Sequence, residues 1–277
     1  MPTAVLLSGG LDSAVLLADE AVRGEVQPVY VSVGLAWEAA ERAMVSLFLA
    51  HARFHGRVRP LVSLSVDMRD VYAASHWAVE GRPPAYHTPD EDVYLPGRNI
   101  VLLGKAGVYC AAAALDRLVL GTLAHNPFPD ATPEFRAAMA RALTLGLAHD
   151  LQIDAPYAGT SKPEVVKRGI ALGLPLELTL SCMSPVVARR SSLVARRSSL
   201  VARRSSLVAR AATASEQRAT STEHRATSDE QRETSDEQRE LPLHCGTCSK
   251  CRERHDAFLE LGLADPTVYE DERHVRA

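Results

Sequence analysis

A glycine-rich turn near the amino terminus constrains the fold more than any other feature. Residues 4–7 are apolar and predict a short buried strand, and residues 14–18 have the composition of a helix. Between them lies Ser8-Gly9-Gly10-Leu11-Asp12-Ser13, whose glycines allow a sharp turn and close approach of a ligand. A strand, tight turn and helix direct backbone N–H groups at one place, which suits a phosphate. The alternative is a plain turn with two structural glycines and no ligand.

The polar residues of this turn refine the prediction. Ser8 and Ser13 add hydroxyl donors for a phosphate. Asp12 would repel an anion, so it fits better beside a metal ion that accompanies a nucleotide, or as a cap on the helix. The string S-G-G-x-D-S directly after a first strand resembles the PP-loop ATP pyrophosphatases. That resemblance implies that ATP binds here, that AMP is attached to a substrate oxygen, and that pyrophosphate is released. The kinase-type loop is excluded because its G-K-[ST] ending is missing.

Length, charge and hydropathy limit the number of domains and the class of protein. A chain of 277 residues suits one α/β domain with an appendage, or two small domains. The formal net charge of −3 argues against broad electrostatic binding of nucleic acid. The chain starts directly with a strand and has no run of eighteen or more apolar residues. We therefore expect a cytoplasmic protein without a membrane span.

Strand-like and helix-like segments alternate along the first 172 residues. Alternating β and α segments predict a parallel sheet with helices on both faces, in which ligands bind at the carboxyl ends of the strands. The prediction is a Rossmann-like α/β fold with five parallel strands, similar to the adenine nucleotide alpha hydrolases. Residues 68–96 predict a long loop beside the site. The later predicted strands are 26–33, 58–66, 118–121 and 153–156, and the later predicted helices are 37–54, 99–115, 134–147 and 162–172.

Three segments at these strand ends carry candidate substrate-binding residues. Arg98 and Asn99 follow a Pro-Gly turn at a helix start, where Arg98 could clamp a phosphate or carboxylate, or simply lie on the surface. Asn126 and Asp130 lie in a proline-rich loop and could bind the edge of a flat heterocycle, with turn and cap chemistry as the competing interpretation. Lys162 at a helix start is unfavourable to the dipole, which favours a phosphate partner, although a solvated lysine is the alternative.

Four of the five cysteines form a second motif. Cys245, Cys248 and Cys251 have the spacing C-x-x-C-x-x-C, and Cys182 lies upstream. Four thiolates complete a closed tetrahedral zinc site, which would be structural because it has no open position. An iron–sulfur cluster is the chemical competitor. Cys110 lies in an apolar helical segment and is best explained as a buried small hydrophobic residue.

The order of these motifs resembles the 7-cyano-7-deazaguanine synthases, the QueC family, over nearly the whole chain except about 186–240. The resemblance rests on SGGLDS, Tyr94-x-Pro96-x-Arg98-Asn99, Phe128-Pro129-Asp130-x-x-Pro133-Glu134-Phe135, Ala155-Pro156, Lys162, Ser181-Cys182 and the run C-G-x-C-x-x-C-x-x-R that begins at Cys245.

The resemblance implies that ATP adenylates the carboxylate of 7-carboxy-7-deazaguanine, that ammonia displaces AMP, and that a second ATP drives dehydration of the amide to the nitrile. It implies an ATP-binding domain at 1–180, a zinc-binding region at 181–277, one structural Zn²⁺, ATP with Mg²⁺, and a homodimer. Ser8, Asp12 and Ser13 would be the catalytic residues, and Cys182, Cys245, Cys248 and Cys251 the metal ligands. The ATP-binding residues would be Leu7, Ser8, Gly9, Gly10, Leu11, Asp12, Ser13, Ala14, Val15, Leu16 and Leu17.

Two departures from the family pattern bear on the substrate. Gly34-Leu35-Ala36-Trp37-Glu38 replaces a Tyr-Gly-Gln-x-His-like segment, and Asp130-Ala131-Thr132 replaces Asp-Cys-Arg. The alternative is therefore a PP-loop enzyme that adenylates a related deazapurine or a tRNA base. A zinc-stabilised binding module without catalysis would leave the SGGLDS string unexplained. No second catalytic domain is recognisable, so we expect free ammonia as the nitrogen donor.

A repetitive block interrupts the cysteine motif. Val-Ala-Arg-Arg-Ser-Ser-Leu recurs at Val187, Val194 and Val201, and polar units such as 226–232 follow with the same period of seven. One interpretation is a basic arm for RNA or a regulatory Arg-Arg-x-Ser tract. The favoured interpretation is a tolerated low-complexity insertion at about 186–240, either disordered or loosely helical.

Overall fold

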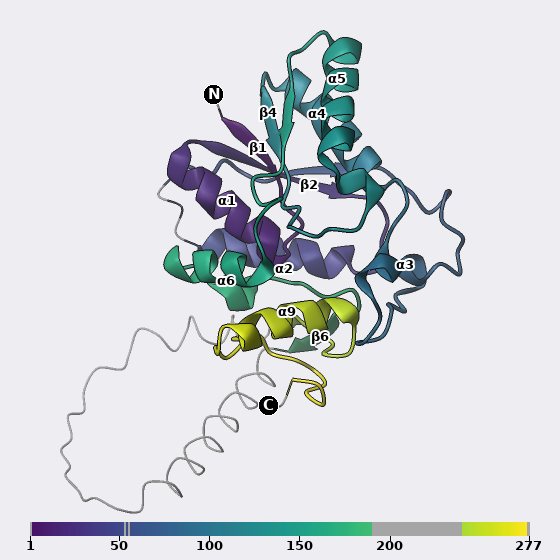
Figure 1. The fold of residues 1–277 in the computed structure, drawn as a ribbon, viewed down its shortest axis with the longest axis vertical. Helices are drawn as coiled ribbons and strands as arrows, with labels where there is room; N and C mark the ends of the chain where they lie inside the picture. The colour runs from purple at the N-terminus through teal and green to yellow at the C-terminus, as the bar shows by residue number, and fades with distance from the viewer. Residues whose placement is uncertain (1, 53, 55, 190–239, 276–277) are drawn as a thin grey trace, which may run out of the picture. The chain divides into compact units, whose positions relative to one another are not determined.

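The computed structural model describes residues 2–52, 54, 56–189 and 240–275. These contain a five-stranded sheet in the order β3-β2-β1-β4-β5, with every neighbouring pair parallel. The predicted α/β fold with five parallel strands is confirmed (Figure 1). The strands are β1 (Thr3–Leu6), β2 (Val26–Ser32), β3 (Val62–Ser65), β4 (Arg117–Val119) and β5 (Gln152–Asp154).

The order of the strands positions the site. β1 is central, and it pairs with β2 on one side and β4 on the other. The chain winds from β1 toward β2 and β3, and later from β4 toward β5, so the direction of winding reverses beside β1. Loops that follow β1 and β4 diverge at such a reversal and leave a crevice at the carboxyl ends of the strands. The glycine turn of residues 8–13 and Gly121 both lie at this edge.

Helices cover both faces of the sheet (Figure 1). They are α1 (Leu11–Arg23), α2 (Glu38–His51), α4 (Arg98–Ala112), α5 (Pro133–Leu147), α6 (Lys162–Ala171) and α9 (Ser249–Glu260). Adjacent strand residues alternate between two cores: Ala4 and Leu118 contribute to the core beneath α4 and α5, whereas Val5 and Val119 contribute to the core beneath α1 and α6. This alternation follows from the two-residue period of a strand.

The helix ends follow their local sequence. Thr132 accepts a hydrogen bond from the backbone N–H of Phe135 and so caps α5, with Pro133 at its first position. Ser161 and Glu164 form a reciprocal capping box at the start of α6. The predicted helices therefore agree with the observed ones to within a few residues at each end.

Two segments differ from the prediction. Residues 68–96 are largely irregular, as predicted, but include a helical turn, α3 (Trp77–Glu80), and a 3-10 turn, η1 (Asp90–Val93). Trp77 stacks on Trp37 with ring centroids 5.8 Å apart. The predicted strand at 58–66 is shorter, because Val58 makes only an isolated bridge to Val26 and Pro60 then interrupts the backbone hydrogen bonds.

The chain divides into two compact units. The first comprises Met1–Val186 and Leu243–Ala277, and the second comprises Val187–Pro242. β6 (Val186–Arg189) and β7 (Glu240–Leu243) pair in a small sheet that the sequence did not predict. The seven-residue repeats fall mainly at 190–239, which lies outside the described residues. Within the described ranges, no helix is long and apolar enough to cross a membrane.

Candidate active site and metal site

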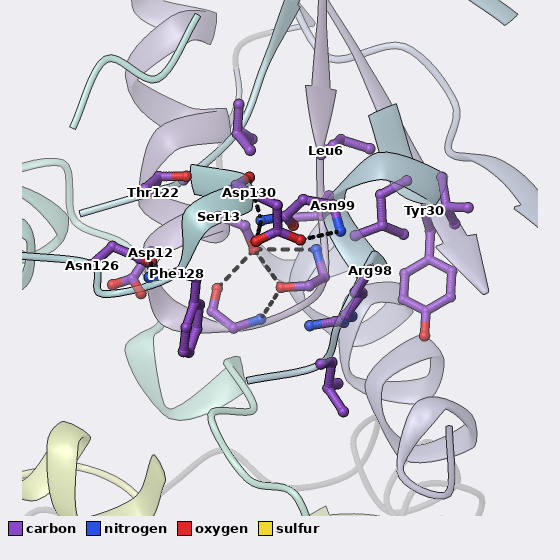
Figure 2. Close-up of a pocket in the computed structure, with 18 of the residues that line it drawn as sticks. Leu6, Asp12, Ser13, Tyr30, Arg98, Asn99, Thr122, Asn126, Phe128 and Asp130 are labelled. Atoms are coloured by element: carbon purple, nitrogen blue, oxygen red, sulfur yellow. Dashed lines mark hydrogen bonds between the residues drawn. The ribbon is translucent and has the colours of Figure 1, made fainter. Parts of the chain in front are cut away.

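The turn after β1 is held by its own serines. Ser13 Oγ donates to the carbonyl of Gly10 at 3.0 Å and accepts from the backbone N–H of Ser8 at 3.2 Å (Figure 2). The Ser8 and Ser13 hydroxyls lie 3.2 Å apart. Gly10 is the N-cap residue of α1 and, as a glycine, has no side chain with which to cap it. The N–H of Leu11 is taken by Ser181 Oγ, whereas Gly10, Asp12 and Ser13 line the cavity described below. The start of α1 therefore lies at this cavity, as a phosphate site requires.

Glycine is required at two places around this turn. Gly9 has φ +82°, and a Cβ there would lie 2.9 Å from Val45 Cγ2 and 3.3 Å from the carbonyl oxygen of Glu41. A Cβ on Gly121, directly after β4, would lie 3.3 Å from the backbone N of Ser13. The turn is therefore packed against α2 on one side and against the end of β4 on the other, which fixes its shape.

Asp12 does not cap α1. Its Oδ2 accepts from Lys162 Nζ at 2.6 Å, and Lys162 also lies 3.1 Å from Glu253 Oε1 on α9. The Lys162 side chain is only 12% exposed, so it is not a solvated lysine. Burial opposes the charged form of Lys162, but the carboxylates of Asp12 and Glu253 outweigh burial and raise the pKa of the amine. Asp12 Oδ1 is buried and has no hydrogen-bond partner among the described residues, so one carboxylate oxygen remains available to a cation.

A cavity of about 260 Å³ opens beside the turn (Figure 2). It is lined by the turn, by the ends of β1, β2 and β4, by residues 93–102 and by the proline-rich loop. Tyr94 and Phe128 line it and stack on each other, with centroids 5.2 Å apart. Four of the five predicted substrate residues also line this cavity, namely Arg98, Asn99, Asn126 and Asp130, whereas Lys162 does not.

Asn126 and Asp130 are engaged in local structure. Asp130 Oδ2 accepts from the backbone N–H of Asn99 at 3.1 Å, and Asn99 Nδ2 donates to Asp130 Oδ1 at 3.2 Å. Asn126 Oδ1 accepts from the backbone N–H of Phe128 at 3.0 Å. The turn and cap chemistry considered as the alternative is therefore present. It fixes the proline-rich loop to the start of α4 and leaves Arg98 facing the cavity, with its Nε buried and unpartnered among the described residues.

The cavity also contains a buried carboxyl, that of Glu41, which the sequence analysis missed. Tyr30 Oη on β2 donates to Glu41 Oε2 on α2 at 2.9 Å, and both residues line the cavity. Glu38 accepts from the backbone N–H groups of Val33 and Gly34. Burial raises the pKa of Glu41 to about 7, although Arg98 opposes this rise. The missed signal is that Glu41 precedes Val45 and Phe48 by four and seven residues, which puts it on the buried face of α2.

The four predicted cysteines converge. The Sγ atoms of Cys182, Cys245, Cys248 and Cys251 all lie within 4.8 Å of one another. Cys251 Sγ is 3.5 Å from Cys248 Sγ and 3.8 Å from Cys245 Sγ. Zinc–sulfur bonds of about 2.3 Å in a tetrahedron place the sulfurs about 3.8 Å apart. The donor set therefore fits a metal ion with four thiolate ligands, and it offers no open coordination position.

Cys110 lies apart from this cluster. It is buried in α4, and burial raises the pKa of its thiol to about 12. It therefore stays protonated at neutral pH and packs as a small apolar residue, as the sequence predicts.

The segment Leu180–Cys182 joins the cysteines to the glycine turn. Leu180 N donates to the carbonyl of Gly9 at 2.7 Å, and Ser181 Oγ accepts from the backbone N–H of Leu11 at 3.3 Å. The backbone N–H of Ser181 in turn donates to Nε2 of His244, a buried residue whose pKa burial lowers to about 3. The neutral ring of His244 thus orients the residue before Cys182. Two connections therefore link the cysteine cluster to the turn. One is the segment of residues 180–182, and the other is Lys162, which bridges Asp12 of the turn and Glu253 of α9.

The arginine that ends the cysteine motif is structural. Arg254 is fully buried, and its guanidinium donates to Thr179 Oγ1 at 2.7 Å and to the carbonyl of Leu176 at 2.9 Å. It also pairs with Asp265. Burial raises the pKa of the Asp265 carboxyl, but the charge of Arg254 and hydrogen bonds from Tyr269 and Thr267 lower it by more, so the pKa lies below its usual value. α9 is therefore fixed to the segment that precedes Leu180.

Gly246, between the first two clustered cysteines of the C-terminal motif, gives a direct test of this packing. It has φ +78°, and a Cβ there would lie 1.8 Å from the backbone oxygen of Asp271. We expect Gly246→Ala to lower the free energy of unfolding by about 2–5 kcal/mol, because backbone strain and overpacking add. Thermal unfolding and metal content measure the effect. Gly262→Ala is the control: its φ is +65°, but no atom of the described residues lies within 4 Å of the added Cβ, so only about 1–2 kcal/mol of strain is expected. Equal effects of the two substitutions would contradict the packing argument.

A family model described as queuosine biosynthesis protein QueC matches residues 3–192. The chain belongs to the QueC family. The match spans the glycine turn, every residue that lines the cavity and the first of the four cysteines. The family predicted from the motifs is confirmed.

Named members of the family match most of the chain. A 7-cyano-7-deazaguanine synthase of Methanopyrus kandleri is 27% identical and covers 96% of this chain and 98% of its own length. A protein of the same name from Thermoplasma acidophilum is 31% identical, over 64% of this chain and 77% of its own. A solved structure of the U34-tRNA thiolase NcsA from Methanococcus maripaludis is 13% identical with a TM-score of 0.41, covering 63% of this chain and 58% of that chain. The named QueC relatives are enzymes.

Proposed function

We propose that this protein is an ATP-dependent ligase that converts 7-carboxy-7-deazaguanine and ammonia to 7-cyano-7-deazaguanine, the nitrile precursor of queuosine. The observation that carries the proposal is the QueC match together with an intact S-G-G-x-D-S turn that opens into a cavity. The cavity combines an arginine with a stacked aromatic pair, which suits a flat heterocycle that bears a carboxylate.

ATP solves the chemical problem of this substrate. A carboxylate is a poor electrophile, and its conversion to an AMP ester creates a good leaving group. Ammonia then forms the C–N bond as the C–O bond to AMP breaks, which gives the amide. A second ATP activates the amide oxygen, and loss of that oxygen with AMP leaves the nitrile. Each step depends mainly on positioning and on stabilisation of developing charge.

We assign ATP binding to residues 7–17. The backbone N–H groups at the start of α1 and the hydroxyls of Ser8 and Ser13 are placed to hold phosphate oxygens. Asp12 fits Mg²⁺ through its Oδ1, which has no partner in the described part of the chain. When bound, Mg²⁺ offsets the charge of the phosphates and of the departing pyrophosphate. Lys162 reaches this region through Asp12, so we assign it to the ATP side of the site rather than to the heterocycle.

We assign the heterocyclic substrate to the cavity. Arg98 is the cation for its carboxylate, and Tyr94 and Phe128 are the apolar surface beside its rings. Asn99 and Asp130 support this surface through the hydrogen bonds that fix the loop. Asn126 shapes the same loop through its turn.

We further propose that Cys182, Cys245, Cys248 and Cys251 hold one structural Zn²⁺, since the closed thiolate set and the spacing of the sulfurs suit zinc. An iron–sulfur cluster would differ by its visible absorption. A cytoplasmic location agrees with reduced cysteines that bind a metal. The division into a 1–180 domain and a 181–277 region, and a homodimer, stay predictions.

Exchange between ATP and labelled pyrophosphate tests the proposal. With Mg²⁺ and no ammonia, 7-carboxy-7-deazaguanine should support exchange, because adenylation is reversible while the acyl-adenylate stays bound. Guanine, which has no carboxylate, is the control and should support none. Exchange with another deazapurine acid but not with this one would reassign the substrate. Absence of exchange with every acid would contradict adenylation.

A further inference from the structure

A carboxyl group inside the cavity remains without a role in the function proposed above. Glu41 lies in the first turn of α2, is 7% exposed and lines the cavity with Tyr30 and Arg98. Glycine at position 9 of the ATP-binding turn packs against this same helical turn, at the Glu41 carbonyl and Val45. Glu41 is therefore at the junction of the ATP-binding turn and the proposed substrate cavity.

The surroundings of Glu41 suit proton transfer. Tyr30 Oη donates to Oε2 at 2.9 Å, and its own pKa is raised far above the usual value, first by burial and then by Glu41, so it stays a donor. Arg98 on α4 favours the ionised form of Glu41, whereas Glu38 on α2 and burial oppose it. A buried carboxyl balanced in this way can both accept and release a proton near neutral pH.

The proposed reaction needs such a group. When ammonia attacks the acyl-adenylate, the nitrogen carries one proton more than the amide product. That proton must leave as the C–N bond forms and the bond to AMP breaks, otherwise ammonia is expelled again. The other residues assigned above are already committed: Arg98 and Lys162 are cations, and Asp130 is engaged by Asn99. Asp12 is held by Lys162 and is assigned to Mg²⁺ on the ATP side of the site.

We propose that Glu41 is the general base that takes this proton from the attacking nitrogen, with Tyr30 holding its carboxylate in place. The balance is ammonia, acyl-adenylate and Glu41 carboxylate giving amide, AMP and Glu41 carboxylic acid, which then returns its proton to solvent. This role rests on the proposed function.

Glu41→Gln tests the role with two nucleophiles. Ammonia needs the base, whereas hydroxylamine forms an adduct acidic enough to lose its proton to water. We expect the variant to form amide about 100-fold more slowly at pH 7, and to form hydroxamate and exchange pyrophosphate at nearly the wild-type rate. Glu260→Gln, an exposed charge loss on α9, is the matched control and should behave as wild type.

The outcomes separate the two claims. A wild-type protein that forms neither amide nor hydroxamate overturns the proposed function. A Glu41→Gln variant that forms both products at wild-type rates overturns the role of Glu41 alone. If the variant loses both activities because it fails to fold, a second variant decides.

Tyr30→Phe keeps the carboxyl and removes the hydrogen bond that lowers its pKa. In the wild type, amide formation at a fixed free-ammonia concentration should rise with pH through about 7, as Glu41 ionises. In Tyr30→Phe this inflection should move to higher pH by roughly half a unit to one unit. Hydroxamate formation should not show the inflection in either protein. An unshifted profile in Tyr30→Phe would overturn the proposal.

Discussion

Replacement of Cys248 and Cys251 by serine is expected to abolish metal binding and to unfold α9 and its surroundings at room temperature. Both thiols are buried, at 1% and 0% exposure, and with them two of four ligands are lost. A structural zinc ion stabilises small zinc-binding peptides by about 10–16 kcal/mol at neutral pH. Even a fraction of that is comparable with the 5–15 kcal/mol that keeps a typical domain folded.

Metal analysis and thermal unfolding measure this effect. Cys110→Ala is the matched control, because Cys110 is equally buried but lies outside the cluster. It should keep one metal per chain and lose only about 1 kcal/mol. The double variant should also bind ATP poorly, because Leu180–Cys182 holds the glycine turn by two hydrogen bonds. Full metal occupancy and a wild-type melting temperature in the double variant would contradict the assignment of these ligands.

Lys162→Met is the second substitution with a large expected effect. It leaves the carboxylates of Asp12 and Glu253 close together and without their shared cation. Loss of one partner of a buried ion pair costs about 3–5 kcal/mol, and we expect a loss of this size at pH 7. ATP affinity should fall as well, because Asp12 is then free to turn away from its present position.

The pH dependence of this loss has a definite sign. Although burial acts against ionisation, Lys162 and Lys250 lower the pKa of Glu253 from 4.5 to about 2 in the folded protein. The stability that the Lys162–Glu253 ion pair contributes is present above pH 4.5 and is lost as the pH falls through about 2. The difference between wild type and Lys162→Met should therefore shrink across that window. Lys167→Met, an exposed lysine on the same helix, should cost little at any pH. A constant difference between pH 7 and pH 2 would contradict the ion-pair argument.

Local sequence patterns were sufficient to predict the α/β fold, the glycine turn and the cysteine cluster of this protein. The glycine turn, the alternation of strands and helices, and the cysteine spacing are each encoded in short stretches of sequence. The helix starts at Pro133 and Lys162 follow from caps that lie next to them. Burial on both faces of β2 explains why its apolar residues Val29, Tyr30 and Val31 follow one another without alternating with polar ones.

The contacts that complete the site depend on residues far apart in the chain. Lys162 contacts Asp12 across 150 positions, and no local rule pairs an α6 lysine with the first turn of α1. Asp130 looked suited to a ligand because its role as a cap for α4 depends on the fold. Glu41 was missed because a glutamate in the first turn of a helix is normally exposed to solvent and interacts favourably with the helix dipole. Here β2 buries Glu41 against Tyr30.

In the proposed reaction, ATP held at the turn of residues 8–13 activates a carboxylate so that ammonia can convert it to a nitrile. The most direct measurement is mass spectrometry of 7-carboxy-7-deazaguanine incubated with the metal-loaded protein, ATP, Mg²⁺ and ammonium, with AMP counted in the same samples. We expect 7-cyano-7-deazaguanine, with the amide as an intermediate and two AMP for each nitrile. Folded, metal-loaded protein that consumes no ATP and leaves the acid unchanged would contradict the proposed reaction.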